Sequence, residues 1–400
     1  MATHTRTETY APPAGLGGTP LMMAAAVGIV ALGAAFLLGG EHFYKGYLLA
    51  ILFWTGASLG CLALLMVQHL SGGAWGVVTR RIYEAAGRTL PLMALLFVPI
   101  ALGLPHLFEW ANPEAVAADP ILQHKQPYLN VPFFLARAVI FFVVWSALAL
   151  ALSRWSRRQD DADGVEREQL ARKMQRLSGG GLVAYAVTAF FMSVDWVMSL
   201  DPHWFSTIYG MLFMVNQGLS GLALTIALLI LLARHAPMSR VVAPAHLHDL
   251  GKLLLAFVML WAYLTFSQFL IVWSANLPEE IPWYLTRWAG GWRAVSVALI
   301  VCHFIVPFLL LLNRDLKRRS GLLALVAVWI LVMRFVDLFW LIGPLHGARE
   351  LSVHAADFLA PIGVGGLWAA MFLRQLKATP LLPLGEPELQ GALEHGRHAH

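Results

Sequence analysis

The sequence has little charge and little cysteine. Asp, Glu, Lys and Arg make up 13% of the 400 residues and hydrophobic residues make up 58%, against roughly 25% and 45–50% in soluble domains. A water-soluble core could not bury this excess of apolar side chains, so a soluble globular protein is excluded. The two cysteines, Cys61 and Cys302, lie in apolar runs without a further ligand at metal spacing. We therefore expect neither a disulfide framework nor a metal or iron–sulfur site in this chain.

Long apolar runs recur along the whole chain. Because a helix needs roughly 20 apolar residues to cross a bilayer, these runs predict an all-α polytopic membrane protein with about ten transmembrane helices within residues 20–376. The expected spans are 20–39, 44–70, 89–110, 131–153, 178–200, 205–233, 250–274, 289–313, 320–344 and 353–376. The first run has no convincing small-residue cleavage site, so we interpret it as a retained helix rather than a signal peptide.

Basic residues gather in alternate loops and predict the orientation. Arginine and lysine are concentrated after the second, fourth, sixth, eighth and tenth runs, whereas the other loops carry only Lys45, Lys125, Arg287 and Arg349. By the positive-inside rule, residues 1–19 and the tail 377–400 are both cytoplasmic. The net charge of +5 then reflects topology and not nucleic-acid binding.

Three cytoplasmic segments have distinct sequence character. Segment 154–177 has many charges of both signs, so we expect a linker or a partner-docking helix there. The tail after Pro380 is expected to be extended and mobile. Between the second and third runs, apolar residues at helical spacing lie opposite charged ones, which suits a helix on the membrane surface or an ordinary connecting helix. The apolar residues are Trp75, Val78, Ile82 and Ala85, and the charged ones are Arg80, Arg81 and Glu84.

Few ionisable residues fall inside the expected spans. Charges at membrane depth are costly and mark functional sites by default. Arg334 and Asp337 are three residues apart and share a helix face, so they can form an ion pair, with a structural or a functional role. Asp195 has no evident partner nearby in the sequence and is a candidate for handling protons or a quinone head group. The candidates for a proton path or quinone site are Asp195, His303, Arg334, Asp337, Asp357 and Gln268.

The polar residues are unevenly distributed along the spans. Most fall in the half expected to face outward, which suits a hydrated proton half-channel open to that side. His303 is open to a second interpretation, a hydrogen-bonded core residue. In the inner half, His248, Asp249 and Lys252 are candidates for proton entry or form an interfacial cluster. A complete path across the membrane is not evident in the sequence.

Two loops on the outward side are rich in proline, acid and aromatic residues. Proline stiffens them and tryptophan anchors at the interface, so we expect ordered caps. Acidic caps suit the docking of a large outer partner, although aromatic anchoring alone also explains the tryptophans. The docking candidates are Asp201, His203, Trp204, Glu279, Glu280 and Trp283.

Segments 191–207, 273–284 and 334–340 resemble the ActF-type, NrfD-like membrane subunit of bacterial alternative complex III. The resemblance implies two four-helix bundles with two peripheral helices in the bacterial inner membrane. It also implies a hetero-oligomeric quinol:electron-acceptor oxidoreductase. The implied partners are an NrfD-like sister subunit, an iron–sulfur subunit, c-type cytochrome subunits that carry haem, and lipids.

Under this resemblance the chain itself carries no covalent cofactor and no redox centre, but a quinone or quinol remains possible. The leading hypothesis is a subunit that supports quinol oxidation in its neighbour and conducts protons. The alternatives are a quinol site in this chain, a purely structural scaffold, and a secondary transporter.

Overall fold

The computed structural model describes residues 10–13, 15, 18–344 and 350–397, and this part of the chain is helical without a β-strand. Within it, nine stretches are long and apolar enough to cross a membrane. The first, Thr19–Ser71, contains two helices, α2 (Thr19–Gly39) and α3 (Phe43–Ser71), joined by the 3₁₀ turn η2 (Gly40–His42). The prediction of a multi-pass, all-α membrane protein with about ten spans is therefore confirmed.

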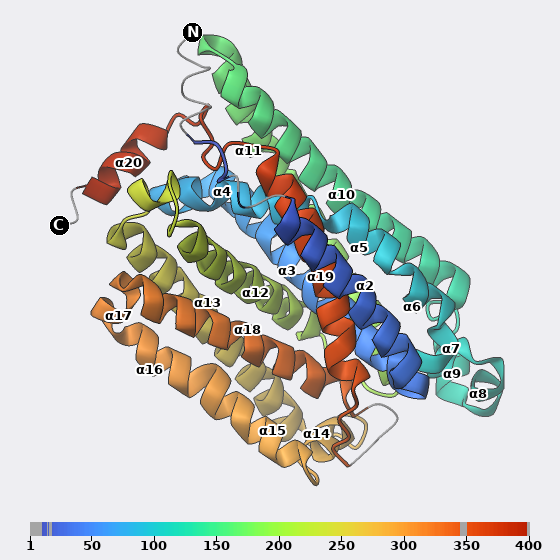
Figure 1. Ribbon diagram of the computed structural model, residues 1–400. Helices are drawn as coiled ribbons and strands as arrows, with labels where there is room; N and C mark the ends of the chain where they lie inside the picture. The colour runs from blue at the N-terminus through green and yellow to red at the C-terminus, as the bar shows by residue number, and fades with distance from the viewer. Residues whose placement is uncertain (1–9, 14, 16–17, 345–349, 398–400) are drawn as a thin grey trace.

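Eight spanning helices form two bundles (Figure 1). The first contains α3, the pair α5 (Leu90–Leu96) and α6 (Val98–Leu102), α10 (Val131–Asp161) and α11 (Gly164–Trp196). The second contains α12 (Tyr209–Leu232), α13 (Pro244–Ala275), α18 (Ser320–Ile342) and a span built from α15 (Trp292–Ala298), η6 (Leu299–Ile305) and α16 (Val306–Leu312). Helix α12 packs on both α3 and α11, so it joins the bundles.

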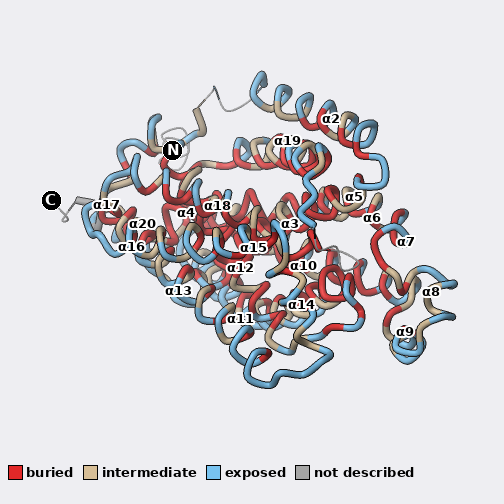
Figure 2. The backbone as a smooth tube through the Cα atoms, turned by 90° about the horizontal axis from the view of Figure 1, so that it is seen from below, coloured by how far each residue is buried: buried red, intermediate tan, exposed pale blue. Residues whose placement is uncertain are grey.

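Two further helices lie outside the bundles, as the resemblance implied. Helix α19 (Ala356–Lys377) packs along α3, and α2 packs on α19. Figure 2 shows that α2 turns its exposed residues away from the rest of the protein. Its exposed side chains include Val30, Leu37 and Leu38, which suits contact with lipid or a neighbouring membrane subunit.

The two ends of the molecule differ. At the terminal end lie α4 (Ala74–Gly87), α17 (Arg314–Arg318), α20 (Leu389–Arg397), η5 (Met238–Arg240) and the backbone pair in which Leu381 N–H donates to the Tyr10 carbonyl at 2.9 Å. At the opposite end, called the loop end, lie α7 (Leu104–Leu107), η3 (Glu109–Ala111), α8 (Pro113–Ala118), α9 (Pro120–Lys125), η4 (Met198–Leu200) and α14 (Ile281–Arg287).

The terminal end corrects two sequence expectations. Helix α4 is not a surface helix, because every residue from Gly76 to Gly87 is buried, including Arg80 and Arg81. The tail, residues 380–397, is not extended throughout: Leu381 and Leu382 are buried and α20 packs on α4 and α13. Sequence hydropathy could not indicate this cover, because it joins segments about 300 residues apart.

The charged segment 154–177 is a helical hairpin. Helix α10 runs to Asp161 and α11 begins at Gly164, so only residues 162–163 turn between them. At about 1.5 Å per residue, the two helices extend past the other helices at the terminal end, as Figure 1 shows. Arg154, Arg172 and Lys173 are exposed on this hairpin.

Candidate functional site

Arg334 and Asp337 form the ion pair that their spacing predicts. Both side chains are buried on α18, and an Arg334 guanidinium N–H donates to the Asp337 carboxylate. The Arg334 Nε–H also donates to the Ser220 hydroxyl of α12 at 3.4 Å. The pair therefore connects two helices of the second bundle and places both signs of charge at their contact.

A narrow cavity, here called the central chamber, adjoins Arg334 where the two bundles meet. It is lined by residues of α3, α11, α12 and α18, and its free space admits about one water molecule. Thr55 Oγ1, both amide atoms of Asn216 and Gln217 Nε2 are buried there, and no described residue forms a hydrogen bond with them. Buried polar atoms in proteins are nearly always paired with protein or ordered water, so this lining suits hydration.

Toward the loop end, Tyr209 is the next polar residue of α12 before Asn216, and the apolar Phe213 lies between them. Tyr209 and Phe213 precede Asn216 and Gln217 at helical spacing, and their rings lie 5.2 Å apart. Tyr209 lies within electrostatic reach of Asp337 on one side and of Asp201 and Arg287 on the other. It also lines a second narrow cavity, the loop-end cavity, together with Asp201 and Arg287.

Close helix packing limits the chamber toward the terminal end. A Cβ at Gly60 of α3 would lie 1.8 Å from the Gln217 carbonyl oxygen of α12, so the two backbones touch there. One turn further, the Cys61 thiol lies 3.6 Å from the Gly221 carbonyl oxygen. Close packing of α3 and α12 therefore bounds the chamber on this side.

Asp195 is paired, which corrects the expectation of an unpartnered carboxylate. Arg137 of α10 donates to both carboxylate oxygens of Asp195, at 2.7 and 3.0 Å, and the Tyr128 hydroxyl donates to one of them at 2.8 Å. The guanidinium also lies 3.9 Å from the Tyr128 ring centre. Sequence reasoning missed this pairing because Arg137 and Asp195 are 58 positions apart and lie on different helices.

The Asp195 pair lies one helical turn from the central chamber. Met192, three residues before Asp195 on α11, lines the chamber with Arg334. Asp195 and Arg334 thus belong to separate ion pairs near one chamber. The structure brings these two predicted residues near one cavity without placing them in contact.

His303 lies in the interior of the second bundle on the π-helical turn η6. Pro307 lacks the N–H that an α-helix would direct to the His303 carbonyl, and here Val306 N–H bonds five residues back to Val301. The His303 side chain is fully buried, and neither ring nitrogen has a partner among the described residues. Its ring meets the edge of Trp261 at 4.3 Å, and the Arg334 charge reaches it. His303 is therefore a core residue, and no described residue provides the hydrogen bond that the second interpretation assumed.

Two other candidates lie elsewhere. Gln268 accepts a hydrogen bond from Ser206 at 3.3 Å and donates to the Tyr284 hydroxyl at 3.2 Å, so it connects the two loops at the loop end. Asp357, at the start of α19, accepts from the His354 backbone N–H at 2.9 Å. Neither residue lines the central chamber.

The two loops form an ordered cap, as predicted. Trp204 stacks on Trp283 at 4.6 Å, and Trp283 meets Trp340 of α18 edge-on at 5.3 Å. His203 contacts Asp119 at 2.6 Å, which ties the segment of α8 and α9 to the same cap. Glu279 is exposed and Glu280 is half-buried, so both remain available to a partner.

Arg287 holds this cap together and was not singled out from the sequence. Its guanidinium donates to the carbonyls of Leu341 at 2.7 Å and Trp283 at 3.1 Å, and lies 3.6 Å from the Trp283 ring centre. Burial lowers the pKa of Arg287 to about 10, so it remains a cation at neutral pH. Sequence analysis did not single out Arg287 because arginines in loops usually mark membrane topology alone.

The predicted entry residues on α13 form a surface cluster. Lys252 Nζ contacts Asp249 at 3.1 Å, Lys252 is exposed, and His248 is partly exposed. These contacts favour the interfacial interpretation. The buried histidine of this region is His246, whose ring accepts from Ala243 N–H at 3.1 Å and lies 3.0 Å from the Ala392 carbonyl of the tail.

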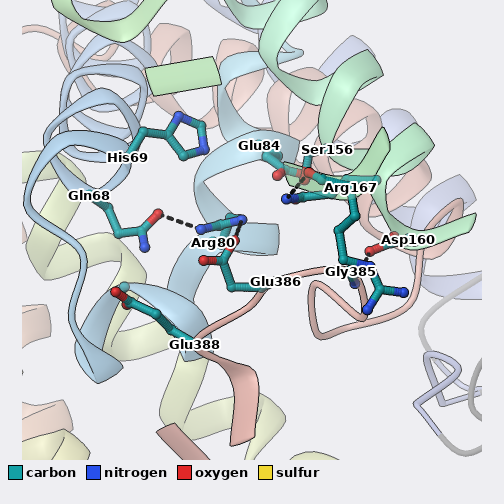
Figure 3. Close-up of polar contacts among 12 residues, drawn as sticks. Gln68, His69, Arg80, Glu84, Ser156, Asp160, Arg167, Gly385, Glu386 and Glu388 are labelled. Carbon is teal, nitrogen blue, oxygen red and sulfur yellow. Dashed lines mark hydrogen bonds and ion pairs between the residues drawn. The ribbon is translucent and has the colours of Figure 1, made fainter. Parts of the chain in front are cut away.

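A second polar cluster fastens the tail to α4 (Figure 3). Arg80 donates to Glu386 of the tail at 2.5 Å and to Gln68 of α3 at 3.0 Å. Arg81 pairs with Glu84 and Asp160, and Asp160 in turn accepts from Gly385 N–H at 3.2 Å. The arginines that looked like surface charges therefore have partners from three other segments.

A comparison of the sequence with protein-family models and with curated proteins found no match. In the described part of the chain, no group of three or more His, Cys, Asp or Glu residues could hold a metal ion. Neither the central chamber nor the loop-end cavity is wide enough for a quinone ring.

Proposed function

We propose that this protein is a membrane subunit of a quinol-oxidising complex of the alternative complex III type, and that it conducts protons beside the subunit that oxidises quinol. The redox centres belong to partner subunits in this proposal. The chain would lie in the bacterial inner membrane with both termini in the cytoplasm, so the loop end faces outward.

One observation carries the proposal: the three segments that resemble the ActF-type subunit meet in space. Trp204, Trp283 and Trp340 come one from each segment and form a single aromatic contact group. Arg334 of the third segment lines the central chamber and pairs with Asp337 of the same segment. The three segments that share a resemblance therefore supply both the aromatic contact group and the buried ion pair.

In this proposal, protons move between the chamber and the loop end. Asp337 is the group that exchanges a proton, and Arg334 stabilises its charged form at membrane depth. Water in the chamber and the Tyr209 hydroxyl provide the intervening donors and acceptors. Because quinol oxidation on the outer side releases protons there, a series that opens toward the loop end fits the reaction of the neighbour.

The alternatives are supported less well. A quinol site in this chain needs a wider space than the two cavities provide in this conformation. A secondary transporter needs discontinuous helices in matching halves. Among the described spans, the interrupted ones are α5–α6 and α15–η6–α16, which are the second span of the first bundle and the third span of the second bundle, so their positions do not match. A pure scaffold would make no use of the unpartnered polar atoms of Thr55, Asn216 and Gln217.

The test is Asp337→Asn in the purified complex, with Asp315→Asn as the matched control because Asp315 is exposed on α17. We expect Asp337→Asn to slow proton release during quinol oxidation about tenfold or more, with the control unchanged. Release would be followed with a pH dye in proteoliposomes. Unchanged oxidation and unchanged release in Asp337→Asn, and also in Asp195→Asn, would leave only the scaffold.

A further inference from the structure

Two arginines at the terminal end of the first bundle have no acidic partner among the described residues. Arg88 follows α4 and Arg157 lies on α10, within electrostatic reach of each other. The two helices are in contact here: a Cβ at Gly87 would lie 3.4 Å from that of Ala149, two turns before Arg157, and Arg81 of α4 donates to Ser156, next to Arg157, at 3.1 Å. In the described part of the chain, Arg88 Nε is buried without a hydrogen-bond partner, and Arg157 Nε donates only to the Ser153 carbonyl of its own helix at 3.3 Å.

Neighbouring carboxylates leave this arginine pair uncompensated. Glu84 is the acidic residue whose charge reaches Arg88, but it is bonded to Arg81, as is Asp160. The three arginines therefore face two carboxylates, which leaves one positive charge in excess. Adjacent guanidinium groups in this situation favour an anion that both can contact.

Below the arginines, both helices turn apolar side chains outward. On the span that follows Arg88, Leu95, Val98 and Leu102 are exposed at helical spacing. On α10, Val143 and Leu150 are exposed before Arg154 and Arg157. Helix α5 packs against α10, so an apolar surface shared by two helices ends at a pair of positive charges.

We propose that Arg88 and Arg157 bind the phosphate of an anionic phospholipid whose acyl chains lie along the exposed faces of α5–α6 and α10. Guanidinium groups bind phosphate oxygens through paired N–H donors. A phospholipid has an anionic phosphate above apolar acyl chains, so it complements a basic pair above an apolar face. This site is separate from the central chamber and does not rest on the function proposed above.

The experiment measures retained lipid by native mass spectrometry of the full-length protein in detergent. The probes are phosphatidylglycerol, phosphatidylcholine and inorganic phosphate. We expect preferential retention of phosphatidylglycerol, lowered about fivefold by Arg157→Gln and about 25-fold by Arg88→Gln with Arg157→Gln, since each arginine contributes about fivefold near an anionic headgroup. Arg172→Gln is the matched control, because Arg172 is exposed and paired with Glu168.

Equal retention of phosphatidylglycerol by wild type and both variants would overturn the site, as would equal retention of phosphatidylcholine and phosphatidylglycerol by wild type. Retention of inorganic phosphate by wild type without any retention of phosphatidylglycerol would show that the arginines bind free phosphate and not a lipid. The single Arg157→Gln variant keeps the test decisive if the double variant does not fold, because Arg157 is half-exposed.

Discussion

At the scale of single residues, buried charge is compensated in two different ways. Arg334 and Asp337 pair within one helix, at a spacing that any helix brings together. Arg137 and Asp195 pair between α10 and α11, with Tyr128 as a third partner. The first pair can be predicted from the sequence, and the second depends on which helices pack together.

Removing one partner of the second pair should destabilise the protein strongly. In Arg137→Gln, Asp195 remains fully buried without its cation, and we expect the free energy of unfolding to fall by about 3 kcal/mol. The measurement is unfolding in mixed detergent and SDS, followed by circular dichroism. The double variant Arg137→Gln with Asp195→Asn should recover much of the loss, because neither charge is left alone; a double variant less stable than Arg137→Gln would contradict the pairing.

The cap at the loop end should depend on the charge of Asp119. The Ile121 backbone N–H, with a smaller contribution from His203, lowers the pKa of Asp119 below its ordinary value of 3.8. A lowered folded pKa means that this stabilisation is present above pH 3.8 and is lost as the pH falls through the folded value. We expect Asp119→Asn to speed proteolysis of segment 109–130 at pH 7 and to have a progressively smaller effect as the pH is lowered below 3.8 with an acid protease; an effect that does not decrease with pH would contradict this prediction.

At the scale of helices, α12 is the element shared by both bundles and by the candidate site. One face carries Tyr209, Asn216 and Gln217, and further along the helix Gly221 packs on Gly60 and Cys61. The polar residues and the glycine contact therefore lie on different stretches of the same helix. Hydropathy predicts that this segment is a membrane-spanning helix, but it does not show which face of the helix carries the polar residues of the site and which packs against α3.

A methyl group at Gly60 should separate α3 from α12. Its Cβ would lie 1.8 Å from the Gln217 carbonyl oxygen, a contact that only a backbone shift relieves. We expect Gly60→Ala to lower the free energy of unfolding by about 3 kcal/mol, measured by the same SDS titration. Gly33→Ala is the control, since nothing lies within 4 Å of its Cβ position and alanine favours the helix by up to about 1 kcal/mol. Equal stability of the two variants would show that the helices do not touch at Gly60.

At the scale of the whole molecule, contacts between distant segments close both ends. The three tryptophans join the loops and α18 at the loop end. At the terminal end, the tail covers α4 through Glu386 and α20. The faces of the bundles that these segments leave uncovered are therefore those that face the membrane.

The tail should loosen when its ion pair is removed. Arg80 is 2% exposed and Glu386 is 12% exposed, so Glu386→Gln leaves a buried guanidinium with Gln68 and a neutral amide. We expect a loss of about 2 kcal/mol and faster hydrogen exchange over residues 381–393. The control is Glu394→Gln, because Glu394 is exposed on α20. Unchanged exchange in Glu386→Gln would show that apolar burial of Leu381 and Leu382 holds the tail without this pair.

The sequence by itself determined the class of protein, the number and approximate bounds of the spans and the Arg334–Asp337 pair. These properties depend on local hydropathy and on the helical repeat, which act within about 20 residues. Only the tertiary structure decided that Asp195 binds Arg137, that the tail buries α4, and that Thr55, Asn216 and Gln217 line one chamber. In an apolar span every face suits lipid, so hydropathy does not specify which faces meet, and side-chain packing between helices makes that choice.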